Sequence, residues 1–329
     1  MVDGETIVFR FTDDEQARTQ VRLWCDLDLP ETTFVRTADE WQLRIERPPV
    51  DRLEYLFDLD GEFLVDPGNP LVVPGAFGDH SWLPLPGYAA PAWLEVEPVP
   101  HQITTIADDV AVWSPADSRA GETLPLLLAH DGPEMAAYGQ VDHYVGAMIA
   151  VGRLPRLRLA LLAPGERSSR YSANPAYADT LTRELVPLLR RVCPTDGPLV
   201  LMGQSLGAVA ALHAAWTHPG TFGGLFLQSG SFFTPELDPQ EASFEHWAAV
   251  TGFVARVHAE GSAGRDFPRA SLVCGSAEEN YANNRLMAEQ LTRIGTGVRW
   301  GEVRDGHTWT CWRDLLDPYL TDLLGQVWA

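Results

Sequence analysis

Residues 201–208 read Leu-Met-Gly-Gln-Ser-Leu-Gly-Ala, and the rest of the sequence is organised around them. The mostly apolar residues 197–202 predict a buried strand, and the alanine-rich residues 208–216 predict a helix. A Gly-x-Ser-x-Gly turn between a strand and a helix is typical of a nucleophile elbow, in which the serine is strained and a side chain at either glycine would clash. We therefore predict that Ser205 is a catalytic nucleophile. The amide of Leu206, at the helix N-terminus, is predicted to face an oxyanion.

The composition excludes several classes of function. The chain has 329 residues, of which 45% are hydrophobic, and its formal net charge is −21. Such a charge repels nucleic-acid phosphates and anionic membranes, so we expect neither as a partner. All 24 basic residues are arginine, and a chain without lysine cannot form a Schiff base or a Walker-type phosphate loop. We find no dinucleotide motif and no clustered Cys or His ligands, so we expect no cofactor and no metal.

The sequence shows neither a signal peptide nor an apolar run long enough to span a membrane, which predicts a cytoplasmic location. The expected partner is a small-molecule ester. The sequence leaves the oligomeric state open.

The first 97 residues have the sequence pattern of a small all-β domain. They hold short segments rich in β-branched and aromatic residues, several of which alternate with polar residues as in an antiparallel sandwich. From residue 61 to residue 97 this periodicity is lost among Pro, Gly and aromatic residues. We interpret residues 61–97 as a connecting segment whose rings, Trp82 among them, pack on the next domain or frame a site. The predicted domains are therefore 1–97 and 98–329.

Residues 98–329 change to strands that alternate with helices, which indicates a mostly parallel sheet covered on both faces. We expect helices over 141–151 and 174–192, and an irregular, partly helical insertion over roughly 232–266. With the elbow at its centre, this pattern predicts an α/β-hydrolase domain. The predicted fold class is α/β, with a small all-β sandwich ahead of the hydrolase domain.

The serine needs an imidazole to accept its proton and a carboxylate to hold that imidazole. In an α/β-hydrolase the chain order is Ser, acid, His, with each partner in a loop after a later strand. His307 directly follows a predicted strand, so we predict that it is the general base. For the acid we favour Glu278 over Glu279, because the carboxylate usually lies three residues past the glycine of such a loop. Asp305 is close to His307 in sequence and stays an alternative.

A second oxyanion amide should follow the strand that ends at His130. Pro133 has no amide hydrogen, which leaves Asp131 and Gly132 as candidates. We favour Gly132, because a residue without a side chain lets a substrate approach.

The hydrolase domain contains the segments His130-Asp131-Gly132-Pro133, Arg167, Asn174-Pro175-Ala176-Tyr177, Gly203-Gln204-Ser205-Leu206-Gly207 and Gly306-His307-Thr308-Trp309. Together these segments resemble the enterochelin (ferric enterobactin) esterase family, whose members are α/β-hydrolases of the esterase D type. Residues 53–61 and 66–70 also resemble the immunoglobulin-like module of those esterases. The resemblance implies a cytosolic enzyme that hydrolyses the ester bonds of a catecholate siderophore trilactone so that iron can be released.

The predicted substrate contacts follow from charge and from aromatic residues. A ferric siderophore of this kind is anionic, so a protein of charge −21 needs a local basic patch to bind it. Arg167, Arg170 and Arg285 are the candidates, although Arg170 stands where the family often has an acidic residue. The alternative is that these arginines pair with nearby glutamates. Trp82 and Trp309 are candidate contacts for an aryl group.

Two other functions stay open. The esterase D group also includes feruloyl esterases and mycolyl-transferring enzymes, so another ester or an acyl transfer fits the same motifs. The N-terminal domain also resembles glycan-binding modules of starch and glycogen enzymes, which would fit a carbohydrate-binding protein with a degenerate hydrolase domain. We expect the N-terminal domain to line the site and to set specificity without supplying catalytic groups, since residues 98–329 contain all of these.

Overall fold

The structure is a computed structural model that describes residues 2–3, 5–15, 17–37, 40–119, 121–195, 197–260 and 267–329. It divides into two compact units. Unit 1 consists of Met1–Ala89 together with two loops from the C-terminal part, Gly275–Glu278 and Val303–Cys311. Unit 2 consists of Ala90–Cys274, Glu279–Glu302 and Trp312–Ala329. The domain boundary that we predict after residue 97 remains a prediction.

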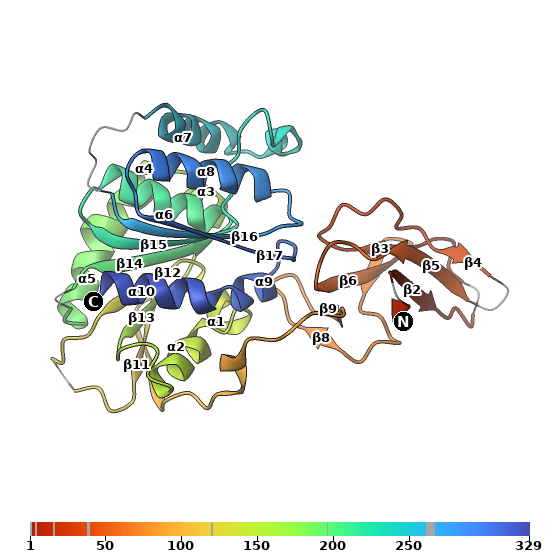
Figure 1. Cartoon of the computed structure of the whole chain (residues 1–329), viewed down its shortest axis with the longest axis horizontal. Helices are drawn as coiled ribbons and strands as arrows, with labels where there is room; N and C mark the ends of the chain where they lie inside the picture. The colour runs from red at the N-terminus through yellow and green to blue at the C-terminus, as the bar shows by residue number, and fades with distance from the viewer. Residues whose placement is uncertain are drawn as a thin grey trace. The chain divides into compact units, whose positions relative to one another are not determined.

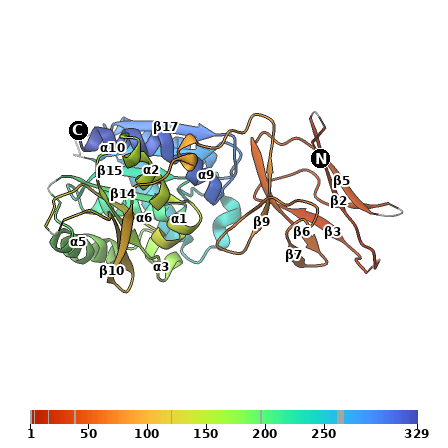
Figure 2. The same ribbon diagram turned by 90° about the horizontal axis from the view of Figure 1, so that it is seen from below.

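Unit 1 is built from short antiparallel strands in two sheets, which confirms the predicted all-β part. One sheet has the order β1-β2-β5-β4, and the other has the order β3-β6-β9-β8 with β7 paired to β6. Figure 2 shows β2 and β5 side by side, and β3, β6 and β7 together. Residues alternate in burial along β5 and β6, and both sheets supply side chains to one apolar core. The strands are β1 (Val2–Asp3), β2 (Thr6–Phe11), β3 (Val21–Trp24), β4 (Val35–Arg36), β5 (Trp41–Glu46), β6 (Arg52–Leu59), β7 (Glu62–Leu64), β8 (Val72–Val73) and β9 (His80–Pro84).

The interpretation of residues 61–97 as a connecting segment is wrong for residues 62–84. These residues contain β7, β8 and β9, and β9 pairs with β6 from Arg52 opposite Pro84 to Tyr55 opposite Ser81. These strands escape detection because they are only two to five residues long and Pro and Gly lie between them. Residues 62–84 are therefore part of the sandwich.

Unit 2 contains an eight-stranded sheet with the order β10-β11-β13-β12-β14-β15-β16-β17. The strands from β13 to β16 in this order pair in parallel, whereas β10 and β11 pair antiparallel. The central strand β14 is buried at all six residues, as expected of a sheet that is covered on both faces. The strands are β10 (His101–Ala107), β11 (Val110–Pro115), β12 (Leu126–Ala129), β13 (Arg158–Leu162), β14 (Leu199–Gln204), β15 (Phe222–Gln228), β16 (Arg269–Gly275) and β17 (Val298–Val303).

Helices cover both faces of this sheet, with α6 and α8 on one face and α2 and α10 on the other (Figure 1). The α/β class and the mostly parallel sheet are thereby confirmed. Among the described helices, none combines the length and apolar character that a membrane crossing needs. The helices include η1 (Ala92–Glu95), α1 (Gly132–Ala137), α2 (Val141–Ala150), α3 (Arg167–Tyr171), α4 (Pro175–Asp179), α5 (Val186–Val192), α6 (Leu206–Thr217), α8 (Tyr281–Arg293), α9 (Trp309–Asp314), η4 (Leu316–Leu320) and α10 (Thr321–Val327).

The helix predicted over 174–192 is present, but its middle turn is wider than an α-helix. Asn174 caps it by accepting the amide of Ala176, and a π-helical segment, η2 (Thr180–Leu185), joins α4 to α5. Pro187, the second residue of α5, has no N–H for the carbonyl four residues earlier, which favours the change of pitch.

The predicted insertion contains a 3-10 helix, η3 (Pro239–Ser243), and the helix α7 (Trp247–Ala259). Its last part, residues 261–266, lies outside the described residues.

Candidate active site

Ser205 stands at a sharp turn between β14 and α6. Its backbone has φ 54° and ψ −124°, a conformation that costs energy for a residue with a side chain. A Cβ on Gly203 would lie 2.3 Å from the carbonyl oxygen of Gly207, and a Cβ on Gly207 would lie 3.3 Å from the Cβ atom of His130. The clash expected of a side chain beside the serine is confirmed at Gly203 and is milder at Gly207.

The side chain of Ser205 has a second serine as its neighbour. The two Oγ atoms of Ser205 and Ser231 are 3.1 Å apart, and the amide of Ser231 donates to the carbonyl of Ser205 at 3.2 Å. Ser231 follows β15 in the sequence Gln228-Ser229-Gly230-Ser231. Ser231 is not among the residues predicted from the sequence, although a polar run directly after a buried strand was the available signal.

The loop that carries Ser231 is held by buried asparagines at the start of α8. Asn284 is fully buried and pairs with Gly230 in both directions, accepting its amide at 2.8 Å and donating to its carbonyl at 2.7 Å. Asn280 donates to the carbonyl of Ser229 at 3.3 Å. A buried polar network of this kind rigidifies the loop, because each broken bond would leave a buried polar group without a partner.

The two amides predicted for an oxyanion hole belong to Leu206, the first residue of α6, and Gly132, the first residue of α1. The N–H groups of the first turn of a helix have no partner within the helix, so they can bind an anion. The amide of Asp131, the alternative to Gly132, donates to the hydroxyl of Tyr171 at 3.2 Å.

Our physical reason for a glycine at position 132 is wrong. A Cβ there would lie 2.4 Å from the Cα of Leu161 and 2.5 Å from the amide nitrogen of Leu162. The missing side chain therefore makes room for the backbone at the end of β13 and not for a substrate. Its role in an oxyanion hole remains a prediction.

Arg167 and Arg170, the predicted substrate contacts on α3, each hold an aspartate. Arg167 donates two hydrogen bonds to the buried Asp131, at 2.8 Å from Nε and 2.9 Å from Nη2. Arg170 donates to Asp109 at 3.0 Å. Gln204 donates to the same Asp131 at 3.0 Å, so the residue before the serine shares the carboxylate that Arg167 holds. These partners are aspartates and not the glutamates considered from the sequence.

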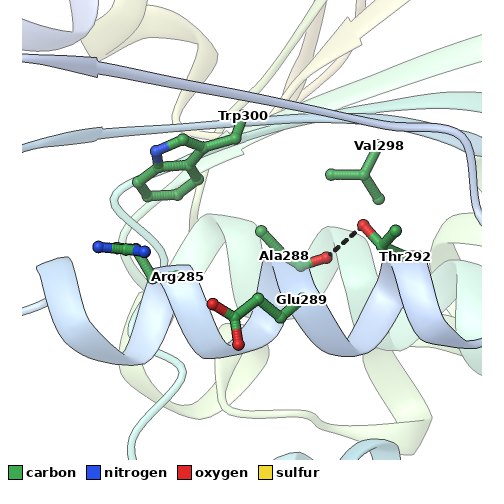
Figure 3. Close-up of a pocket in the computed structure, with 6 residues that line it drawn as sticks. All are labelled: Arg285, Ala288, Glu289, Thr292, Val298 and Trp300. Carbon is green, nitrogen blue, oxygen red and sulfur yellow. Dashed lines mark hydrogen bonds between the residues drawn. The ribbon is translucent and has the colours of Figure 1, made fainter.

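Arg285 lines a hollow of about 370 Å³ between α8 and β17 (Figure 3). Its guanidinium carbon lies 5.9 Å from the ring centre of Tyr281, and Trp300 of β17 lines the same hollow. The three candidate arginines thus have different neighbours, and a joint basic patch remains a prediction. The lining residues are Arg285, Ala288, Glu289, Thr292, Val298 and Trp300.

In unit 1, His307 is paired with Glu278. The Nδ1 atom of His307 lies 2.6 Å from Oε2 of Glu278. Because a carboxylate only accepts, Nδ1 carries the proton in this pair, which leaves Nε2 as the basic nitrogen of the neutral ring. The other oxygen of Glu278 accepts the amide of Gly275 at 2.6 Å, and the glutamate side chain is fully buried.

The other two carboxylates considered for this role have different partners. Glu279 accepts from the amide of Gln240 at 3.4 Å, and Asp305 accepts from Arg52 at 2.5 Å. The geometry thus favours Glu278 as the partner of His307.

Arg52, Glu54 and Asp305 form a buried ionic cluster that the sequence analysis missed. Burial alone would raise the pKa of Glu54, but the contact with His80 and the charge of Arg52 outweigh burial and lower this pKa to about 2. Burial raises the pKa of Asp305 to about 7, against the opposing charge of Arg52. One guanidinium shared by two buried carboxylates thus leaves the second of them easier to protonate.

Trp82 and Trp309, the predicted aromatic contacts, both belong to unit 1 and are half-buried. The ring of Trp82 meets that of Tyr88 edge-on, with centres 5.7 Å apart. Trp309 begins α9, two residues after His307. Their contact with a substrate remains a prediction.

Known proteins resemble the chain in sequence. The chain is 28% identical over 221 residues to the iron(III) enterobactin esterase of Escherichia coli (strain K12), which covers 65% of this chain and 53% of that protein. It is 30% identical over 218 residues to the enzyme of the same description from Dickeya dadantii (strain 3937), which covers 61% of this chain and 48% of that protein. The chain spans about half the length of these curated relatives.

Solved structures resemble it in fold. A crystal structure of the enterobactin esterase from Shigella flexneri, determined in the presence of enterobactin, gives a TM-score of 0.76 at 22% identity and covers 100% of this chain and 94% of that one. The ferric enterobactin esterase from Salmonella typhimurium gives 0.78 at 22% identity, covering 98% and 93%. At such identities the likeness shows the fold, and it extends over the N-terminal sandwich as well as the α/β part.

The profile of the family described as "Putative esterase" matches residues 107–323, more than half of the chain. With the relatives above, this match confirms the resemblance to enterochelin esterases drawn from the sequence. The chain therefore belongs to the esterase family that this profile describes.

Proposed function

We propose that the protein is a serine carboxylic-ester hydrolase in which Ser205, His307 and Glu278 act together. The observation that carries the proposal is the hydrogen bond of 2.6 Å from Nδ1 of His307 to a buried carboxylate, because it prepares Nε2 to accept a proton. The strained turn at Ser205 and the helix that follows it supply the matching nucleophile.

The order of the strands supports this grouping. Ser205 follows β14, Glu278 follows β16 and His307 follows β17, in the sheet order β14-β15-β16-β17. The bonds from Ala270 to Gly297 and from Ser276 to Val303 advance together along both strands, so β17 runs parallel to β16. The carboxyl ends of parallel strands meet at one edge of a sheet, where α/β enzymes carry their sites.

The chemistry follows from these groups. Ser205 Oγ attacks the ester carbonyl while Nε2 of His307 takes its proton, and Glu278 stabilises the imidazolium. The amides of Leu206 and Gly132 donate to the oxyanion. The alcohol leaves with the proton from Nε2, and water then repeats the sequence on the acyl-enzyme, which releases the acid and restores Ser205.

For the substrate we propose an ester of a catecholate siderophore, with the ferric ion as part of the substrate. The names of the curated relatives and of the similar structures support this class. Arg167 is about one-third exposed and uses Nε and Nη2 on Asp131, so its Nη1 edge is the group that we propose for an anionic substrate. A cytoplasmic location remains a prediction.

Two measurements test the proposal. Labelling with a fluorophosphonate should modify Ser205, and a Ser205→Ala variant should stay unlabelled; a glycan-binding protein with a degenerate hydrolase domain need not react. Turnover of ferric enterobactin, of the iron-free trilactone and of simple aryl esters should then rank the substrates. A labelled enzyme that hydrolyses aryl esters but neither siderophore form would contradict the substrate class and keep the reaction class.

A further inference from the structure

A buried arginine of the sandwich holds the loop that carries His307. Arg52, the first residue of β6, has a side chain that is only 1% exposed. Its Nη2 group donates to Oδ2 of Asp305 at 2.5 Å and to Oγ1 of Thr308 at 2.8 Å. These acceptors lie on either side of Gly306 and His307, so one guanidinium fixes both ends of the segment that carries the imidazole.

The orientation of Arg52 is itself fixed. Its Nη1 group donates to Oε1 of Glu54 at 2.5 Å, and Glu54 also lies 3.6 Å from Nδ1 of His80. The planar guanidinium therefore binds acceptors on two sides at once. A lysine at this position keeps the positive charge but cannot reproduce this planar fork.

The backbone of His307 has a separate contact with the sandwich. Its amide donates to Oδ2 of Asp26, in the loop after β3, at 2.6 Å. Two residues before Gly306, the carbonyl of Arg304 accepts the amide of Asp51 at 2.8 Å. The main chain on both sides of the imidazole is thus held by residues from the first 89.

We propose that Arg52 and Asp26 are positioning residues that hold the His307 loop for the reaction. This inference rests on the proposed function, and it gives Met1–Ala89 a part in catalysis that the sequence analysis assigned wholly to residues 98–329. Arg52 and Asp26 do not touch the reacting atoms; they act through the loop that aims Nε2. A merely structural role would lower stability and leave the turnover of each folded molecule unchanged.

The test compares four variants on a small aryl ester, p-nitrophenyl acetate, with the folded fraction measured by circular dichroism. Displacing a catalytic group by about 1 Å can cost about 100-fold in rate, so we expect Arg52→Met to lower kcat by about 100-fold with KM within about threefold. Arg52→Lys should recover part of this loss, because it keeps the charge. Asp26→Ala should lower kcat by about tenfold, whereas Asp28→Ala, an exposed neighbour, should stay within about twofold.

Two further measurements keep the inference testable if Arg52→Met does not fold or if the wild type is inactive. If Arg52→Met does not fold, the kcat of Asp26→Ala tests the inference instead. Asp26 is exposed, so its replacement should leave the fold intact. Folded variants of Arg52 and Asp26 whose kcat matches the wild type would overturn the inference. If the wild type hydrolyses no ester, the proposed function has failed, and the downfield proton signal of His307 Nδ1 then tests positioning alone. A signal unchanged in Arg52→Met and Asp26→Ala would overturn it.

Discussion

Replacing Glu278 by Gln should switch the tautomer of His307. Oε1 of Glu278 accepts the amide of Gly275 at 2.6 Å, and Oε2 accepts Nδ1 of His307 at 2.6 Å. In Glu278→Gln the side-chain oxygen must stay on the Gly275 amide, because an NH₂ group there would face another donor. The NH₂ group then points at Nδ1, which must accept. The ring proton moves to Nε2, and the imidazole can no longer take the proton of Ser205.

The substitution is nearly isosteric, so its effect is confined to the tautomer of His307. Because that tautomer cannot act as the general base, the expected loss of activity is large. An inverted tautomer in a serine triad costs about 10⁴ in kcat, or about 5 kcal/mol of transition-state stabilisation. The fold should change little, since a Gln side chain fills the same buried space. The effect should therefore appear in kcat, with KM for a small ester close to the wild-type value.

Glu279→Gln is the matched control. It changes the adjacent carboxylate by the same chemistry, and the observed partner of Glu279 is the amide of Gln240. Both variants are assayed with p-nitrophenyl acetate. A Glu278→Gln enzyme within tenfold of the wild type, or a Glu279→Gln enzyme equally impaired, would refute the assignment of Glu278.

Four other outcomes follow from the site. Ser205→Ala and His307→Ala should each remove most ester hydrolysis without an additive loss in the double variant, because triad members act as a unit; near-normal turnover in either single variant would contradict this. Chelation with EDTA should leave hydrolysis of a simple ester within about twofold, and a loss restored by a divalent ion would count against the mechanism. The native state binds a proton at Asp305 more tightly than the unfolded state, so the free energy of unfolding should fall as pH rises from about 4 towards 7. Asp305→Asn should flatten this slope in urea denaturation measured above about pH 5.5, one unit above the ordinary pKa of Glu54, where that glutamate is ionised in both states. An unchanged slope would contradict the cause. Gly132→Ala should cost about 3 kcal/mol or more in thermal unfolding, since its Cβ meets the backbone of β13, and a neutral effect would contradict that contact.

The hydrolase sheet could be predicted because its strands carry their signal locally. All residues of β12, β13 and β14 are buried, and apart from Arg158 at the start of β13 and Gln204 at the end of β14 each strand is an apolar run. The strands of unit 1 between residues 61 and 97 could not be predicted in this way. The longest of them, β9, has five residues, and only Ser81 among these is fully buried, so the strand shows no regular alternation. A strand of that length is defined by its partner β6, and the pairing is not written in its own residues.

The catalytic candidates could be predicted for a related reason. Ser205, Glu278 and His307 each follow a strand whose type is evident, and the chain order of this fold selects among the histidines and carboxylates. Gly132 shows the limit of local reasoning. A glycine is needed there because the backbone of β13, about 30 residues later in the sequence, lies too close for a Cβ atom. The loop sequence alone suggested room for a substrate, which was the wrong cause.

Arg52 could not be found from the sequence at all, and the reason is physical. In its own segment it is a charged residue at the start of a strand that alternates in burial, which is the pattern of a solvent-facing position. Its burial depends on Asp305, 253 residues away, and on Thr308, 256 residues away. A charge is stable inside a protein only where partners meet it, so its burial is a property of the folded contact and not of the strand. Arg52 is therefore a residue whose local pattern and final environment disagree, whereas Asp26, an exposed carboxylate in a loop, gives no such disagreement.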